Sequence, residues 1–336
     1  MSKKSRLLLA LLLSSIVLLA GVKIGSVSVS FSTLFETIFS ANSNRLDETT
    51  TTILWNVRFP RVVMAFLVGA ALAVSGTVMQ SLLGNPLASA YTLGVSSGAS
   101  LGAALVIITG FTIPILSGFV LPFVGFIFGL VTVFIVLIMS QRLDQKMTNQ
   151  TVILVGMVMT LFVGAMLTML TALFKDYLQQ LVFWQMGSFS GSTWGKIQIF
   201  IPIVFIGTVC LWLDSSGLDV LSLGEEQALI SGVEVKHLKL RVMVLAALLA
   251  GSAVSFVGVI GFIDLIAPHV IRRYFGAAHR WVIPCSALLG GSLMVLGDTI
   301  SRTLLSPQEI PIGAVTALIG APFFMYVYFN KRRNSL

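Results

Sequence analysis

Apolar runs long enough to cross a lipid bilayer dominate this sequence. Of its 336 residues, 56% are hydrophobic and only 10% are charged, whereas a soluble globular domain carries about 25% charged residues. A membrane-spanning helix needs about 20 mostly apolar residues, so a chain of this length holds roughly eight to eleven of them. The sequence therefore predicts an all-α polytopic membrane protein and excludes a large soluble core.

Breaks between the apolar runs divide the chain into ten expected spans. They cover residues 7–25, 62–82, 92–109, 114–139, 149–172, 197–213, 242–257, 258–270, 282–301 and 311–329. The seventh and eighth are the weakest, because glycines punctuate this region and one long helix would also fit. No small-x-small cleavage site clearly follows the first run, so we expect a retained span rather than a signal peptide.

Lysine and arginine set the expected orientation, because cytoplasmic loops are enriched in them. With the N-terminus inside, twice as many of the 21 basic residues fall on the cytoplasmic side as outside. An even number of spans keeps the basic C-terminal segment inside as well, so both termini are expected to be cytoplasmic. The five tryptophans fall at expected span ends, where indole rings favour the headgroup region.

The sequence offers no arrangement of residues for catalysis or metal binding. Cys210 and Cys285 stand far apart in apolar runs, which supports neither a disulfide framework nor a thiolate metal site. The three histidines lack HExxH spacing, and GSTWGKI at 191–197 lacks both the spacing and the Ser or Thr of a phosphate-binding loop. We therefore expect no catalytic residue, no metal and no cofactor in this chain.

Ionisable side chains are scarce inside the expected spans, although an ion-coupled carrier needs them at depth. Only Asp264 and Asp298 qualify, and Asp298 precedes Arg302 by four residues, which permits a local ion pair. The chain is therefore expected to draw energy from another protein. An ion-coupled secondary carrier stays the alternative function, and the role of Asp264 stays open.

The most polar long stretch is SLGEEQALISGVEVKHLKLR at 222–241. Apolar residues recur in it at helical spacing, and its mixed charge and expected cytoplasmic placement suit an amphipathic element that docks on a partner. Ala228, Leu229 and Val233 are expected to form the apolar docking face, and Gly224 and Gly232 are expected to mark the start and the end of a short helix. A merely solvated loop is the alternative interpretation.

A series of short motifs follows in order along most of the chain. They are RFPR 58–61, GNPLAS 84–89, LGVSSGA 93–99, WQMGS 184–188, GEEQA 224–228, GFIDLIAPHVIR 261–272, GAAHR 276–280, GDTISR 297–302 and EIPIGAVTALIGAPFF 309–324. In this order they resemble the FecCD-type permeases of bacterial ABC importers for iron–siderophores, haem and cobalamin. The resemblance implies a type II ABC importer permease with ten spans, a single transmembrane domain over 1–336, in the bacterial cytoplasmic membrane.

The resemblance also implies partners and a substrate. The partners are a second permease subunit, identical or paralogous, two cytoplasmic ATPase subunits and an extracytoplasmic substrate-binding protein. Iron–siderophore is the commonest substrate class of the family and is the expected one here. Asp264 departs from the pattern, since glycine is common at its position, and so do Ala90 and Ser231, where proline and leucine are usual.

Three sets of residues receive roles by resemblance. The loop at about 214–241 is expected to form coupling helices that dock on the ATPase, through Gly224, Glu225, Glu226, Gln227, Ala228, Leu229 and Gly232. Arginines at the outer surface are expected to meet acidic residues of the binding protein: Arg58, Arg61 and Arg302. The fifth span is expected to line the translocation path with Met157, Thr160 and Met166, although methionine-rich helices are also common as adaptable core.

Overall fold

Each expected span coincides with a helix of the structure. The computed structural model describes residues 2–25, 48–116 and 118–333, and this part of the chain contains helices but no β-strand. The helices that match the expected spans are α1 (Lys3–Lys23), α4 (Phe59–Leu82), α5 (Val95–Thr109), α6 (Val120–Leu143), α7 (Asn149–Leu173), α9 (Trp194–Leu213), α12 (Val235–Val257), α13 (Ile263–Phe275), α14 (His279–Thr303) and α15 (Ile312–Arg333).

Four shorter α-helices complete the described chain: α3 (Glu48–Ile53), α8 (Leu178–Met186), α10 (Ser215–Leu221) and α11 (Glu225–Ile230). A π-helix over Leu54–Arg58 joins α3 to α4, and 3-10 turns lie at Ala90–Leu93, Pro114–Leu116 and Lys175–Tyr177. Seven of the described helical segments are long and apolar enough to cross a membrane, and α5 and part of α15 are shorter apolar helices. Helix α13 has 13 residues, about 20 Å at 1.5 Å per residue, so it does not cross a ~30 Å hydrocarbon core alone.

Helix α4 forms the centre of the bundle and packs on α9, α12, α13 and α14. Small residues allow its backbone to approach its neighbours closely. A Cβ atom at Gly69 would overlap the carbonyl oxygen of Gly290, and one at Gly76 would overlap the carbonyl oxygen of Asp264. Gly69 and Gly76 therefore allow the short distance between α4 and the α13–α14 pair.

The region 242–270 contains two helices rather than one, and the break between them is held by backbone contacts. Helix α12 ends before Gly258, whose φ is +86°, and a Cβ there would overlap the carbonyl oxygen of Trp184. The Ser188 N–H donates to Val257 O at 2.8 Å. Non-helical backbone at membrane depth is tolerated where it is buried in protein, and the segment after α8 provides that cover.

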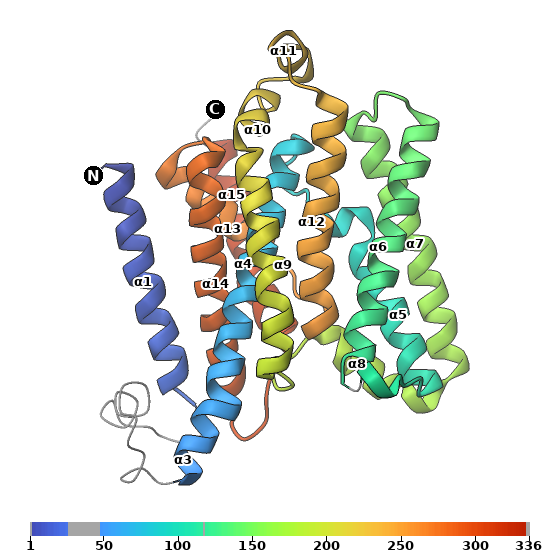
Figure 1. Cartoon of the computed structure of the whole chain (residues 1–336), viewed down its shortest axis with the longest axis vertical. Helices are drawn as coiled ribbons and strands as arrows, with labels where there is room; N and C mark the ends of the chain where they lie inside the picture. Colours follow the sequence, from blue (N-terminus) through green and yellow to red (C-terminus); the bar gives the residue numbers. More distant parts are fainter. Residues whose placement is uncertain (1, 26–47, 117, 334–336) are drawn as a thin grey trace.

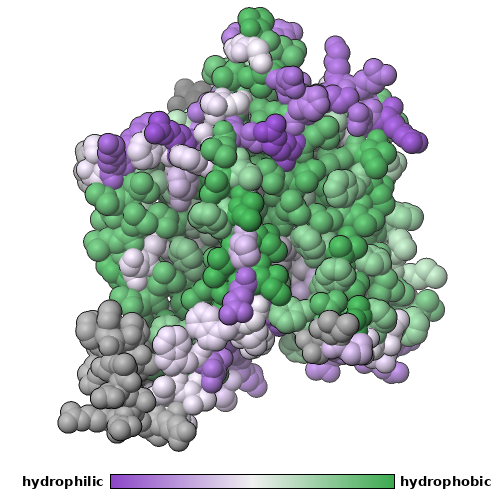
Figure 2. Space-filling view, in the orientation of Figure 1, coloured by the Kyte–Doolittle hydropathy of each residue, from purple (hydrophilic) through white to green (hydrophobic). Residues whose placement is uncertain are grey.

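Both described ends of the chain lie at the same end of the bundle. Figure 1 places the start of α1, helices α10 and α11 and the end of α15 at one end, here called the α11 end, with α3 at the other. Figure 2 shows an apolar surface across the middle of this face, with hydrophilic residues gathered at the two ends. An even number of membrane crossings places both termini on the same side, in agreement with this arrangement. That the α11 end is cytoplasmic stays a prediction.

Candidate functional site

The polar loop forms two short helices that project from the bundle. Helix α10 continues from the end of α9 beside the start of α12, and α11 stands beyond both (Figure 1). Gly224 and Gly232 bracket α11 as predicted, with φ angles of +124° and +78°, which side chains other than glycine rarely adopt. After α11 the Val233 N–H donates to Ala228 O at 3.0 Å, which closes the turn into α12. The structure therefore has a compact, glycine-bounded helix where the sequence predicts one.

The exposed face of α11 differs from the predicted one. Ala228 is completely buried, so the expectation that it lies on the docking face is wrong. Leu229 is exposed by 62%, as predicted, and the other apolar side chains at the surface are Ile230 and, just before α11, Leu223, exposed by 86% and 73%. Helix α11 has only six residues, so the sequence pattern is too short to predict which side chain faces the bundle. Only the contacts in the structure show it.

The two glutamates of α11 have different surroundings. Glu225 accepts a hydrogen bond from the Lys239 ammonium at 2.5 Å, and the same ammonium donates to Met147 O at 3.1 Å. Lys239 is buried, with 1% of its surface exposed. It thus ties α11 to the connection between α6 and α7. Glu226 and Gln227 are exposed and lie beside the apolar residues of α11.

A chain of polar contacts leads from α10 into the bundle. The Asp219 carboxylate accepts from the His279 N–H at 2.9 Å and lies 2.6 Å from its Nδ1, while Nε2 lies 2.6 Å from Ser81 Oγ. Ser81 in turn accepts from Arg272 at 2.9 Å, and Arg272 donates to Gln80 Oε1 at 2.7 Å. Helices α10, α14, α4 and α13 are joined in this way.

The same chain of contacts reaches Asp264 at the start of α13. Gln80 Nε2 donates to the carbonyl oxygen of Asp264 at 3.0 Å, and the Ser89 hydroxyl donates to its carboxylate. We call the connected set the polar relay: Asp219, His279, Ser81, Arg272, Gln80, Asp264 and Ser89. The extra carboxylate that departs from the family pattern is therefore buried and hydrogen-bonded within this chain.

The three arginines predicted to meet a binding protein lie near the α3 end, but their side chains turn inward. Arg58, Arg61 and Arg302 are buried, with 4%, 7% and 8% of their surfaces exposed. Arg58 donates to Val22 O at 3.2 Å and to Lys23 O at 3.1 Å, at the end of α1. Arg302 donates to the neighbouring carbonyl of Gly21. Arg58 and Arg302 therefore hold the end of α1 in place, and none of the three arginines is presented at the surface of the chain.

Arg61 is the centre of an ion-pair cluster. Its Nη2 lies 2.8 Å from Asp298 Oδ1, and its Nη1 lies 2.6 Å from Glu309 Oε1. The pair of Asp298 with Arg302, which the sequence spacing suggests, is present but longer, at 3.4 Å. Asp298 therefore has its main partner on α4, 237 residues away. The docking role of the arginines stays a prediction, and the structure gives them an internal role.

The residues expected to line a path lie on α7, whose surface is open over much of its length. Met157 and Met166 are 49% and 44% exposed, and the Thr160 hydroxyl donates to Gly156 O at 2.8 Å. Met157 and Thr160 lie one turn apart on one side. Met166 is nine residues beyond Met157, which turns it about 180° around the helix axis. The structure does not bring the three side chains to one face.

Sequence reasoning missed the polar relay and Lys239. The members of the relay are up to 198 residues apart, so no local spacing reveals them. The local signals were Asp264, an ionisable residue inside an expected span, and polar residues at the ends of apolar runs: Ser81, Arg272 and His279.

Comparisons with known proteins agree in one family. The model of the FecCD transport family matches residues 10–330. An uncharacterized ABC transporter permease protein of Bacillus subtilis, YvrB, is 39% identical over 94% of this chain and 91% of its own length. The hemin transport system permease protein HmuU of Yersinia pestis is 37% identical over 97% of this chain and 96% of its own.

A solved structure supports the same assignment. It is described as an inward-facing conformation of a metal-chelate type ABC transporter, and it matches with a TM-score of 0.86 and 32% identity. The match covers 97% of this chain and 99% of the solved one. With the family model, the relatives and this structure in agreement, the chain belongs to the FecCD transport family of ABC importer permeases.

Proposed function

We propose that this chain is the permease subunit of an ATP-driven importer for iron–siderophore complexes in the bacterial cytoplasmic membrane. The relatives support the metal-chelate class, since their names include hemin and iron(3+)-hydroxamate import. One relative is named for molybdate import, so the substrate within the family varies. The observation that carries the proposal is the projecting α11, an apolar contact surface at the end of a bundle in which the buried Asp298 is already paired with arginines.

That pairing disfavours an ion-coupled carrier. Asp298 is held by Arg61 and Arg302, and Asp264 by Ser89. A carrier needs a buried carboxylate that exchanges its ion during transport, whereas Asp298 stands between two cations.

The proposed contact with the ATPase is the apolar tip of α11. Leu229 and Ile230 are exposed, and Glu226 and Gln227 lie at the edge of this patch. A buried apolar centre with a polar rim is the usual composition of a protein interface. Glu225 has a different role in this proposal, because its bond to the buried Lys239 fixes the base of α11 instead of reaching a partner.

Movement of α11 and α10 then reaches the spans through the polar relay. The relay begins at Asp219 on α10 and continues by hydrogen bonds to α14, α4 and α13. Since α4 is the central helix, a displacement of α10 acts directly on the core of the bundle. The exposed surface of α7 is the proposed contact with the second permease subunit, and the same surface is proposed to line the translocation path. The binding protein is proposed to dock at the α3 end.

Coupling is tested by Leu229→Arg, which places a charge in the apolar patch. Because Leu229 is 62% exposed, folding should be little affected. Loss of an interface anchor costs roughly 1–3 kcal/mol, which weakens ATPase binding by roughly 5- to 150-fold. We expect ATPase co-purification and uptake to fall at a normal level of membrane protein.

The matched control is His237→Arg, since the side chain of His237 is 73% exposed and lies on α12 outside the patch. It should retain uptake. Ala228→Arg is not a substitute, because Ala228 is buried and the variant should fail to fold. Retained uptake and co-purification in Leu229→Arg would refute the coupling surface.

Substrate class is tested separately in a strain lacking this gene. Uptake of radiolabelled iron–siderophores should be lost, with hemin and cobalamin uptake retained. Loss of hemin uptake alone would replace the iron–siderophore proposal and leave the coupling proposal intact.

A further inference from the structure

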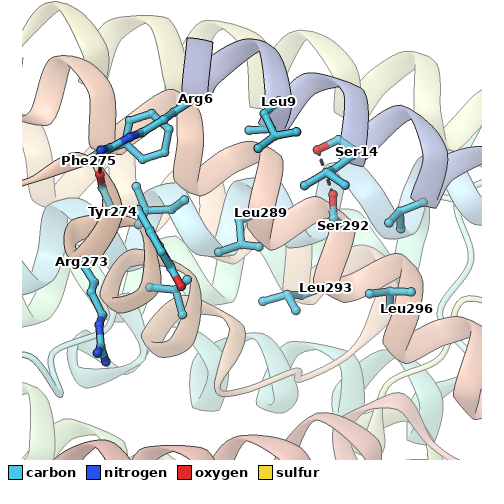
Figure 3. A pocket seen from close by; sticks show the side chains of 15 residues that line it. Arg6, Leu9, Ser14, Arg273, Tyr274, Phe275, Leu289, Ser292, Leu293 and Leu296 are labelled. Atoms are coloured by element: carbon cyan, nitrogen blue, oxygen red, sulfur yellow. Dashed lines mark hydrogen bonds between the residues drawn. The ribbon is translucent and has the colours of Figure 1, made fainter. Parts of the chain in front are cut away.

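A long apolar groove lies between α1 and the α13–α14 pair. Its volume is about 780 Å³, and α1, α13 and α14 each contribute to its lining. Figure 3 shows leucines along both sides, among them Leu9, Leu289, Leu293 and Leu296. The one polar pair in its length, Ser14 and Ser292, is satisfied internally by a hydrogen bond of 3.0 Å. The walls therefore suit a hydrocarbon chain.

One end of the groove is cationic. Arg6 of α1 and Arg273 of α13 line it there, with Tyr274 between the two helices (Figure 3). Arg6 donates one N–H to the carbonyl of Tyr274, which leaves its other N–H groups for a ligand, and Arg273 is exposed. Among the residues that the structure describes, no acidic side chain lines the groove. An anionic group with several oxygens would therefore be favoured at this end.

The groove has the length and position of one membrane leaflet. Arg6 and Val17 are its first and last lining residues on α1, and eleven residues at 1.5 Å per residue cover about 16 Å. Half of a ~30 Å hydrocarbon core is about 15 Å. The arginines lie toward the α11 end of the molecule, at the start of α1, and exposed Tyr274 is an aromatic residue of the kind found at headgroup level.

We propose that this groove binds an anionic phospholipid, with an acyl chain along α1 and α14 and the phosphate at the end lined by Arg6 and Arg273. The occupant must be a lipid, because the groove opens on the apolar side of the molecule. Leu9, Leu13 and Leu296 are 44%, 53% and 45% exposed. The α1 edge is opposite the α7 edge (Figure 1), so the groove does not compete with the face proposed for the second permease subunit. Basic pockets of this kind between membrane helices select anionic headgroups.

The charge requirement is tested by native mass spectrometry of the delipidated, full-length protein. It is titrated with phosphatidylglycerol or phosphatidylcholine of the same acyl chains. The wild type should prefer phosphatidylglycerol, and Arg6→Gln with Arg273→Gln should reduce that preference by roughly fivefold for each arginine removed. Lys3→Gln with Lys4→Gln, which changes exposed residues of the same helix, should leave it unchanged.

Two further measurements separate the remaining explanations. Leu13→Phe fills the groove from an exposed position and should reduce binding of both lipids without altering the thermal unfolding midpoint. Water-soluble glycerol phosphate should not displace the lipid. The proposal is overturned by equal binding of the two lipids to the wild type, by equal losses in the arginine and lysine variants, by undiminished lipid binding in Leu13→Phe, or by displacement with glycerol phosphate.

Discussion

Replacement of Arg61 by glutamine should destabilise the chain more than most single substitutions. Arg61 holds two carboxylates, and the more buried of them, Asp298, is only 1% exposed. Without Arg61 the nearest described cation is Arg302 at 3.4 Å, whose Nε makes no hydrogen bond within the described chain. Removal of one partner from a buried ion pair costs about 3–5 kcal/mol, because the other charge remains buried.

That cost can be expressed as a shift in unfolding temperature. At about 2.1 cal/mol/K per residue the unfolding entropy of a 336-residue chain is about 0.7 kcal/mol/K, so the loss corresponds to roughly 4–7 °C. The measurement is the thermal unfolding midpoint of the purified full-length protein in one detergent. Glu309→Gln is the matched control, since the side chain of Glu309 is 41% exposed and a partly exposed pair contributes about 1 kcal/mol or less.

A second variant distinguishes buried charge from lost packing. Arg61→Gln combined with Asp298→Asn removes both charges, so its loss should be smaller than the sum of the two single losses. The reasoning is refuted if Arg61→Gln unfolds at the wild-type temperature, or if Glu309→Gln falls as far as Arg61→Gln does.

Three other predictions concern the α11 end and the topology. Asp219→Asn should lower the free energy of unfolding by about 1 kcal/mol, because hydrogen bonds to a charged group are stronger than neutral ones, and should reduce uptake; an unchanged midpoint with unchanged uptake would contradict the relay. Hydrogen bonds from Thr148 and from the Lys146 N–H lower the pKa of Asp144 to about 2, so its stabilisation of the α6–α7 connection should be complete above the usual pKa of about 3.9 and lost as the pH falls toward 2. Proteolysis of that connection should therefore accelerate below about pH 4 in the wild type, and in Asp144→Ala it should be fast at every pH; a wild-type rate independent of pH would count against this. A cysteine introduced at Gln308 should react with an impermeant thiol reagent from outside the cell and one at Ser222 should not, and the reverse pattern would invert the predicted orientation.

The positions of the helices could be predicted because apolar runs and their breaks are local properties. Even the uncertain region 242–270 contained its own signal, since Gly258 marks the end of α12. The family could be identified for a similar reason, because its motifs are short and ordered along the chain.

The partners of buried polar side chains could not be predicted. The spacing of Asp298 and Arg302 suggested a local pair, but Asp298 is held chiefly by Arg61 from another helix. Ala228 was expected at the surface, yet it is buried where α11 packs against α10 and α12. In each case the answer depends on which helices become neighbours, and hydrophobic periodicity does not specify that.

The buried arginines near the α3 end have a consequence for how the chain is assembled during its synthesis. The end of α1 is synthesised long before Arg302. The Gly21 carbonyl therefore has no hydrogen bond from Arg302 until a residue 281 positions later has been added. Arg58 reaches the carbonyls of Val22 and Lys23 much earlier. Helix α1 is therefore expected to remain loosely attached in the bilayer through most of translation. It reaches its final position only when α14, the second-last helix of the described chain, is inserted, so lipid has access to its inner face until then.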